Sequence, residues 1–176
     1  MLTLGIPDWI TYDVSGTTLA DVHAAISTLP EAGSCDWSAS SYDASWGDDG
    51  KVTEVEAVIR ITVSMPAWVE ADQAPQAAQD EWNRFWAALR DHEQGHIDIV
   101  TEKIAGVDVA MLDKTEAGAK QVWDAAFDEI NKASKAYDDG NHNGQDEGTI
   151  LDLDAGAPAE SEDESSESES TEQSSN

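Results

Sequence analysis

Residues 74–106 read APQAAQDEWNRFWAALRDHEQGHIDIVTEKIAG, and this stretch decides the fold. Its apolar and aromatic side chains recur at steps of three and four residues, which is the spacing of one face of an α-helix. That face consists of Trp82, Phe85, Trp86, Leu89, His92, His96, Ile99, Val100 and Lys103. Pro75 suits a first helical turn, and Gly106 is a natural end. We therefore predict one long helix that carries two histidines on its inward face.

The residues before this helix favour strands, and those after it favour a second helix. Strand-forming residues occupy 9–14, and a short helix capped by Thr17 or Thr18 should follow. The turn Gly47-Asp48-Asp49-Gly50 predicts a hairpin. The alternation over 59–65 predicts the central strand of the sheet. Residues 115–136 again show helical spacing. The fold class is therefore α+β, with a small antiparallel sheet packed on two long helices.

Composition excludes several classes of protein. The chain has 176 residues, of which 40% are hydrophobic, and nine Lys and Arg face 37 Asp and Glu, for a formal net charge of −28. This charge repels phosphate backbones and anionic membrane surfaces, so we expect neither nucleic-acid nor membrane binding. No apolar run is long enough for a transmembrane helix. The one cysteine, Cys35, excludes an internal disulfide framework and a cysteine-rich zinc module.

The ends of the chain differ in character. We predict a folded domain over residues 1–150 and a disordered, acidic Ser/Glu-rich tail over 151–176, because the last residues contain almost nothing apolar. The first residues lack the basic and apolar regions of a signal peptide. On the sequence given, we therefore expect a cytoplasmic protein, or a chain whose true start lies upstream.

Residues 92–96 read His-Glu-Gln-Gly-His, which is the H-E-x-x-H pattern of zinc peptidases. Positions i and i+4 lie one turn apart on the same helix face, so His92 and His96 can bind one Zn²⁺ ion. Glu93 lies beside the first histidine, where its carboxylate can act as general base on an attacking water. The motif therefore predicts a metal centre with two of its ligands and its base.

A catalytic zinc site needs a third protein ligand, and three candidates remain open from the residues alone. Glu102 lies where the metzincin superfamily has its third histidine, but Ile99 replaces the glycine that bends the chain there, and a straight helix points Glu102 away. Glu116 has the separation seen in zinc peptidases that take a glutamate from the next helix. His142 lies in the polar segment 137–148 and is the last histidine of the chain.

The segment Trp82 to His96, with the strand end Met65-Pro66-Ala67-Trp68 and the pair Tyr137-Asp138, resembles a bacterial family of predicted secreted zinc-dependent proteases. The closing motif of that family is Y-D-x-x-T-x-H-G. Here Asn141 replaces the Thr, the histidine is His142, and Asn143 occupies the expected histidine position. We choose His142 as the third ligand because a loop can adjust by one residue.

The resemblance implies metal-assisted peptide hydrolysis with Zn²⁺ as cofactor and a peptide or protein as substrate. By position in the family motif, Tyr137 is a candidate for stabilising the oxyanion. Asp138 or Asp98 could accept an N–H from a ligating imidazole. Members of the family are usually exported, whereas this chain shows no export signal. We expect the protein to act as a monomer.

Two other functions compete with a zinc metallopeptidase. A non-catalytic, zinc-stabilised binding or structural domain would have four protein ligands and would tolerate Glu93→Gln. An acidic interaction module without metal would bind its partner through the tail, so it would tolerate loss of His92.

Overall fold

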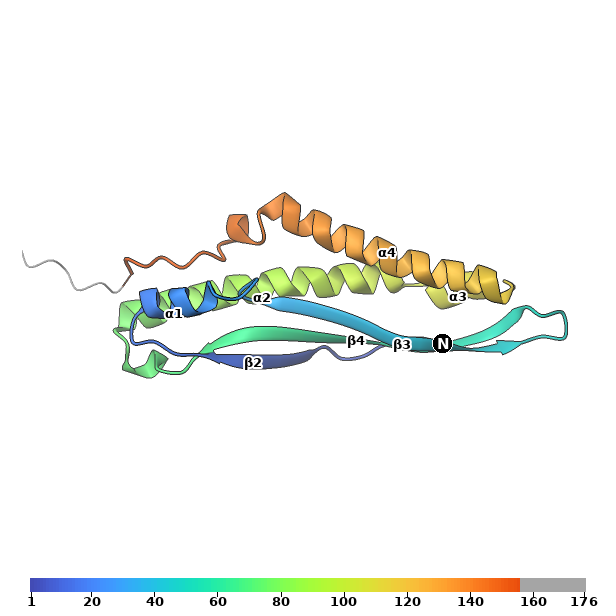
Figure 1. Ribbon diagram of the computed structural model, residues 1–176, viewed down its shortest axis with the longest axis horizontal. Coiled ribbons are helices and arrows are strands. Elements are labelled where there is room, and N and C mark those ends of the chain that lie inside the picture. Colours follow the sequence, from blue (N-terminus) through green and yellow to red (C-terminus); the bar gives the residue numbers. More distant parts are fainter. Residues whose placement is uncertain (156–176) are drawn as a thin grey trace, which may run out of the picture.

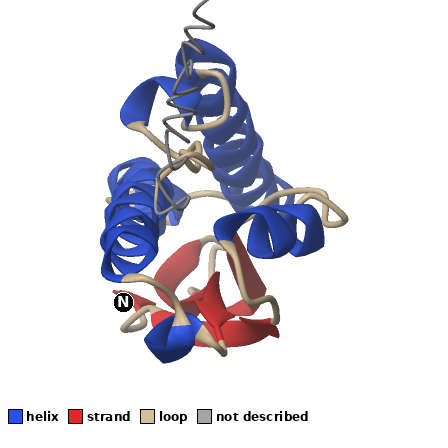
Figure 2. Cartoon of the chain, turned by 90° about the vertical axis from the view of Figure 1, so that its left-hand side faces the viewer, coloured by secondary structure: helices blue, strands red, loops and turns tan. Residues whose placement is uncertain are grey.

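The computed structural model describes residues 1–155, apart from the side chains of residues 39 and 40. The molecule is elongated, with a sheet on one side and long helices stacked above it (Figures 1 and 2). The strands are β1 (Leu2–Leu4), β2 (Asp8–Val14), β3 (Ser34–Trp46) and β4 (Val52–Trp68). The helices are α1 (Leu19–Ile26), η1 (Ala71–Gln73), α2 (Gln76–Ile104), α3 (Val107–Met111), α4 (Glu116–Asn141) and η2 (Gln145–Glu147). This arrangement confirms the α+β class and places the histidine motif on the first long helix.

β4 is the centre of the sheet, and the prediction of an antiparallel sheet is wrong for two of its three pairings. β3 and β4 form the expected antiparallel hairpin. β1 and β2 follow one another along the opposite edge of β4, and both run parallel to it. The cause is the connection after β2: α1 carries the chain across to β3, and the returning strand β4 inserts between β3 and β2. A strand that returns by a hairpin runs against β3 and therefore along β2.

The central strand was correctly located from its alternation. Buried side chains on one face of β4 include Val55, Ala57, Ile59, Ile61, Val63 and Met65. The intervening positions Glu54, Glu56, Val58 and Arg60 are exposed. One face of the sheet therefore carries the core, and the long helices cover that face (Figure 2).

Thr18 is the cap residue of α1. Its hydroxyl accepts a hydrogen bond from the Asp21 backbone N–H, and the Asp21 carboxylate accepts one from the Thr18 backbone N–H. This reciprocal capping box fixes the start of the helix. The chain that leaves α1 runs alongside α2 before β3 begins (Figure 1), and its residues Glu31 and Ala32 form part of the cavity described below.

α4 continues five residues beyond the predicted end at Ala136. The polar run Tyr137-Asp138-Asp139-Gly140-Asn141 is helical, because it continues a stripe of inward positions rather than starting a loop. The helix ends only where His142 takes the left-handed conformation, with φ of 54°. Tyr137 and Asp138 are therefore helix residues that face α2.

The packed body reaches slightly past residue 150. Leu151 is buried in the core, and the Asp152 backbone N–H donates to the Glu81 carboxylate. Most of the segment expected to form an acidic tail, residues 156–176, lies outside the described residues. Within residues 1–155 no helix is both long enough and apolar enough to span a membrane.

Candidate metal centre

The motif residues lie in the middle of α2 and face inward. His92, Glu93 and His96 are only 6%, 3% and 7% exposed. The residues on either side of them along the same stripe, such as Leu89 and Val100, are buried and apolar. Three polar, ionisable side chains therefore lie on the buried face of a long helix. Desolvation there makes unpartnered polar groups costly.

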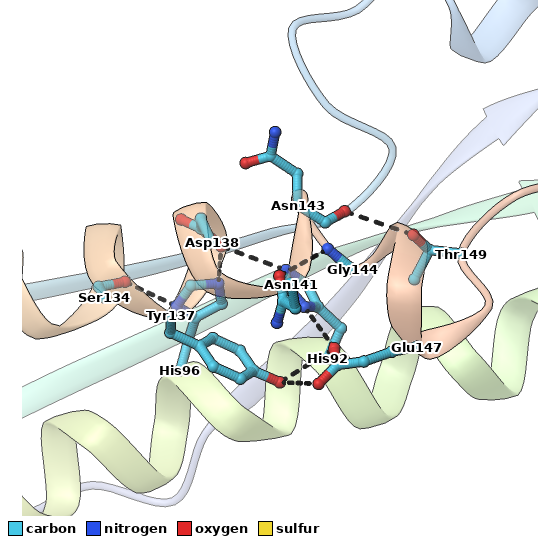
Figure 3. A network of polar contacts seen from close by, with 10 residues as sticks. All are labelled: His92, His96, Ser134, Tyr137, Asp138, Asn141, Asn143, Gly144, Glu147 and Thr149. Atoms are coloured by element: carbon cyan, nitrogen blue, oxygen red, sulfur yellow. Dashed lines mark hydrogen bonds and ion pairs between the residues drawn. The ribbon is translucent and has the colours of Figure 1, made fainter.

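Asp138 completes a three-residue cluster that could hold a metal ion. Its Oδ1 lies 3.0 Å from His96 Nε2 and 3.4 Å from His92 Nε2. One ligand atom from each of the three residues lies within 4.8 Å of the others. Because Asp138 comes from α4, the cluster joins the two long helices (Figure 3).

The opposite nitrogen of each imidazole has its own partner. His92 Nδ1 lies 2.9 Å from Glu147 Oε2, and His96 Nδ1 lies 2.6 Å from Ser134 Oγ (Figure 3). Both rings therefore direct Nε2 towards Asp138. Burial lowers the pKa of His96 although Asp138 opposes this shift, which favours the neutral imidazole that binds metals.

Glu147 reaches His92 because the chain reverses sharply after α4. His142, Asn143 and Gly144 all have positive φ, and the Gly144 N–H donates to Asn141 Oδ1 at 2.9 Å. A Cβ at Gly144 would lie 2.8 Å from Thr149 and 3.1 Å from the His92 ring, so a larger residue would not fit. This turn places η2, and with it Glu147, beside the motif.

Tyr137 packs between the two histidines and occupies the space left by Gly95. Its ring stacks on His92 with centroids 5.1 Å apart, and a Cβ at position 95 would lie 2.5 Å from its hydroxyl oxygen. The hydroxyl donates to Glu147 at 2.9 Å. Burial, the hydrogen bond to Glu147 and its charge raise the pKa of Tyr137, so the phenol stays protonated. The mid-helix glycine of the motif therefore makes room for this ring.

Glu93 is the most unusual carboxyl group of the centre. Its Oε2 is buried and has no hydrogen-bond partner. Burial, followed by the charges of Glu31, Asp138 and Asp36, raises the pKa of Glu93 to about 8. A carboxyl group with this pKa can both accept and release a proton near neutral pH.

A cavity of about 400 Å³ opens beside the cluster. α1 and the segment after it form one wall, α2 forms the floor, and the segment after η2 forms the opposite wall. His92, Glu93 and Asp138 all line it. The side of the cluster that lines the cavity is therefore accessible to a small or extended ligand.

The structure does not bring His142, the chosen third ligand, to the cluster. Its side chain is 70% exposed, and its Nδ1 pairs with Asp146 Oδ2 at 2.8 Å. The reason is local: α4 runs on to Asn141, and the left-handed conformation of His142 turns the chain away from the stripe that faces α2. Asp138, considered from the sequence only as an outer partner, lies beside the two histidines instead.

The other candidates also lie elsewhere. Glu102 is exposed and pairs with Lys103. Glu116 is the first residue of α4 and lies 22 positions before Asp138, or about 33 Å away at the usual rise per residue. Asp98 is exposed and accepts from Gln94 at 2.9 Å.

Sequence reasoning missed Ser134 and Glu147. The signal for Ser134 was present, because it continues the inward stripe of α4 four residues after Ile130. Glu147 gave no signal, since its position depends on the turn at residues 142–144. Cys35 is half-buried and free, and burial with the charges of Glu93 and Asp36 raises its pKa to about 12.

A family model described as bacterial protein of unknown function (DUF922) matches residues 9–145, which is more than half of the chain. The protein belongs to the DUF922 family. The DUF922 match runs from β2 to the start of η2, so it contains the motif and Asp138 but ends two residues before Glu147. No curated protein and no solved structure matches the chain.

Proposed function

We propose that the protein is a zinc-dependent metallopeptidase in which His92, His96 and Asp138 hold the metal and Glu93 is the general base. This assignment keeps the reaction class expected from the motif and replaces His142 with Asp138 as third ligand. The support comes from the geometry of the cluster, the chemistry of its donor atoms and the cavity beside it.

The observation that carries the proposal is the way His92 is held between two carboxylates. An ionised Glu147 can only accept, so Nδ1 of His92 carries a proton, and a neutral ring then directs its Nε2 lone pair at Asp138 Oδ1. A lone pair and an anionic oxygen 3.4 Å apart repel each other unless a cation lies between them. The other possibility is a doubly protonated His92, which a metal titration distinguishes.

The donor set and its spacing fit zinc. Two imidazole nitrogens and one carboxylate oxygen are common ligands of catalytic zinc, with a fourth position left for water or substrate. Tetrahedral zinc with bonds of about 2.0–2.1 Å separates its ligand atoms by about 3.3 Å. The distances of 3.0 and 3.4 Å from Asp138 Oδ1 to the two Nε2 atoms agree with that separation.

The outer partners suit the same role. Glu147 and Ser134 fix the orientation of the two rings through their Nδ1 atoms, as carboxylates and other hydrogen-bonding groups do behind zinc-bound histidines. Tyr137, packed against both rings, limits their rotation. The pocket thus needs little rearrangement to hold a metal.

Zinc bound there would act as a Lewis acid on a substrate carbonyl and would lower the pKa of a bound water. Glu93 takes a proton from the attacking water while the oxygen of that water bonds to the carbonyl carbon. When the C–N bond breaks, Glu93 returns that proton to the leaving amine. The pKa of about 8 applies to the protein without metal, and a divalent cation nearby would lower it towards neutral pH.

Stabilisation of the oxyanion by Tyr137 stays a prediction. Its hydroxyl donates to Glu147, so it would have to leave that carboxylate to reach a substrate oxygen. Its ring, by contrast, is already adjacent to both ligand histidines.

The test is Glu93→Gln in zinc-loaded protein, assayed on a mixture of fluorogenic peptides. We expect kcat/KM to fall by about 100-fold or more, because general acid–base catalysis typically contributes that much. Zinc content should stay at the wild-type level, because Glu93 is not in the ligand cluster. Asp98→Asn, an exposed change on the same helix, is the matched control.

Undiminished cleavage by Glu93→Gln would contradict the proposal. Zinc in both proteins with no cleavage by either would instead favour a structural zinc site.

A further inference from the structure

The cavity beside the metal cluster combines apolar walls with carboxylates. Ile26, Phe85, Leu89 and Leu151 give it buried apolar surface from α1, α2 and the segment after η2. Glu31, Glu93 and Asp138 give it three carboxyl groups. No Lys or Arg is among the residues that line it within the described part of the chain.

Asp138 contacts the two histidines of the cluster, whereas Glu31 lacks the basic partners that acids have on other surfaces of the protein. Along α4, lysines pair with acids at Lys120–Asp124, Lys132–Glu129 and Lys135–Asp139. Glu31 forms no hydrogen bond or ion pair with any residue in 1–155. Partial desolvation raises its pKa, the charges of Asp138 and Asp36 raise it further, and the charge of His92 lowers it.

A second observation indicates that the cavity is made for a ligand. Glu93 is 97% buried, lines the same space, and leaves Oε2 without a partner. Buried polar atoms in native proteins are almost always satisfied, so an orphaned oxygen on a residue that lines the cavity indicates a missing polar partner, such as a water or a substrate group. The adjacent apolar surface would suit the methylene stem of a long side chain.

We propose that this cavity selects substrates with a basic side chain near the scissile bond, and that Glu31 is the residue that binds the positive charge. The inference rests on the proposed peptidase function and names its substrate class. The stem of a Lys or Arg side chain lies on the apolar floor, and its cationic end meets Glu31. An acidic side chain in the same place is repelled by Glu31, whose charge the metal does not compensate as it does that of Asp138.

The test compares three series of fluorogenic peptides that differ in one residue, which is Lys, norleucine or Glu. Within each series this residue is placed at successive positions along the peptide. Norleucine is the matched control, since it keeps the unbranched stem and removes the charge. For the wild-type protein we expect kcat/KM for the best Lys peptide to exceed that of its norleucine match by about tenfold, and the Glu peptide to be slowest. The preference should shrink at high salt.

Substitution assigns the preference to one residue. Glu31→Gln should reduce the ratio of Lys to norleucine cleavage several-fold, and Glu31→Lys should reverse the order of the Lys and Glu peptides. Asp128→Asn, an exposed change on α4, should keep the wild-type ratio. Fluorescence anisotropy with zinc-loaded Glu93→Gln gives a readout without turnover, in which the Lys peptide should bind more tightly.

The outcomes separate the two proposals. Cleavage of all three series with equal efficiency would overturn the charge preference and leave the peptidase intact. A preference for Lys that persists in Glu31→Gln would overturn the role of Glu31. No cleavage of any peptide by zinc-loaded protein would overturn the peptidase function, and this inference with it.

Discussion

The two halves of α4 use one continuous stripe for different purposes. In the first half the inward positions are Ala119, Trp123, Ala126 and Ile130, all buried and apolar. In the second half the same steps of three and four residues place Ser134, Tyr137, Asp138 and Asn141 against α2. The helix geometry does not change between the halves, but the chemistry of the stripe changes completely at Ser134.

This difference shows how the protein can contain a polar centre without losing its fold. The apolar half, together with α3 and the end of α2, supplies packing that does not depend on a ligand. The polar half buries groups that lose their hydration, and the free-energy cost of that loss is offset only by their mutual contacts or by a cation. The apolar packing and the candidate metal centre therefore occupy different halves of α4, and mutations in the two halves should have different effects.

The largest expected effect is on stability, from Ile130→Ala. Ile130 is fully buried, so removing three carbons should cost about 3 kcal/mol of unfolding free energy. Ser134→Ala, one turn further along the stripe, should cost less, about 1–2 kcal/mol, because it removes one hydrogen bond and leaves His96 Nδ1 without its partner. Urea denaturation with a chelator present measures both without a contribution from metal binding. Equal losses in the two variants would break the distinction between the halves.

A smaller effect is expected on metal affinity, from Glu147→Ala. Loss of the carboxylate behind His92 should weaken zinc binding about tenfold, the range seen for such outer partners. Glu147→Gln should lose less, since its amide oxygen can still accept the Nδ1 proton. Asp146→Ala, which removes the partner of exposed His142, is the control and should bind zinc as the wild type does. Competition against a chromogenic chelator gives the affinities, and an unchanged value for Glu147→Ala would exclude its orienting role.

The elements of the fold could be predicted because they depend on local patterns. The alternation at Ile59–Met65 and the helical spacing from Trp82 to Lys103 each reflect burial of one face. The direction of β2 relative to β4 could not be predicted in this way, since it depends on which strand inserts between β2 and β3.

For the candidate centre, two of the proposed ligands and the proposed base came from one motif on one helix. The third partner could not be found by spacing, because it depends on where α4 ends. Treating Tyr137 as the start of a loop made a loop histidine attractive and hid the fact that Asp138 faces α2. A stripe that turns polar looks like the end of a helix when hydrophobicity alone defines the pattern.

The most direct test of the account is the zinc content of purified protein, reconstituted and dialysed, for wild type, His92→Ala, Asp138→Ala and His142→Ala. Circular dichroism would verify that each variant is folded. We predict one equivalent of zinc in the wild type and in His142→Ala, and loss of that zinc in His92→Ala and Asp138→Ala. Absence of zinc from the wild type, or zinc retained in Asp138→Ala but lost in His142→Ala, would contradict the account.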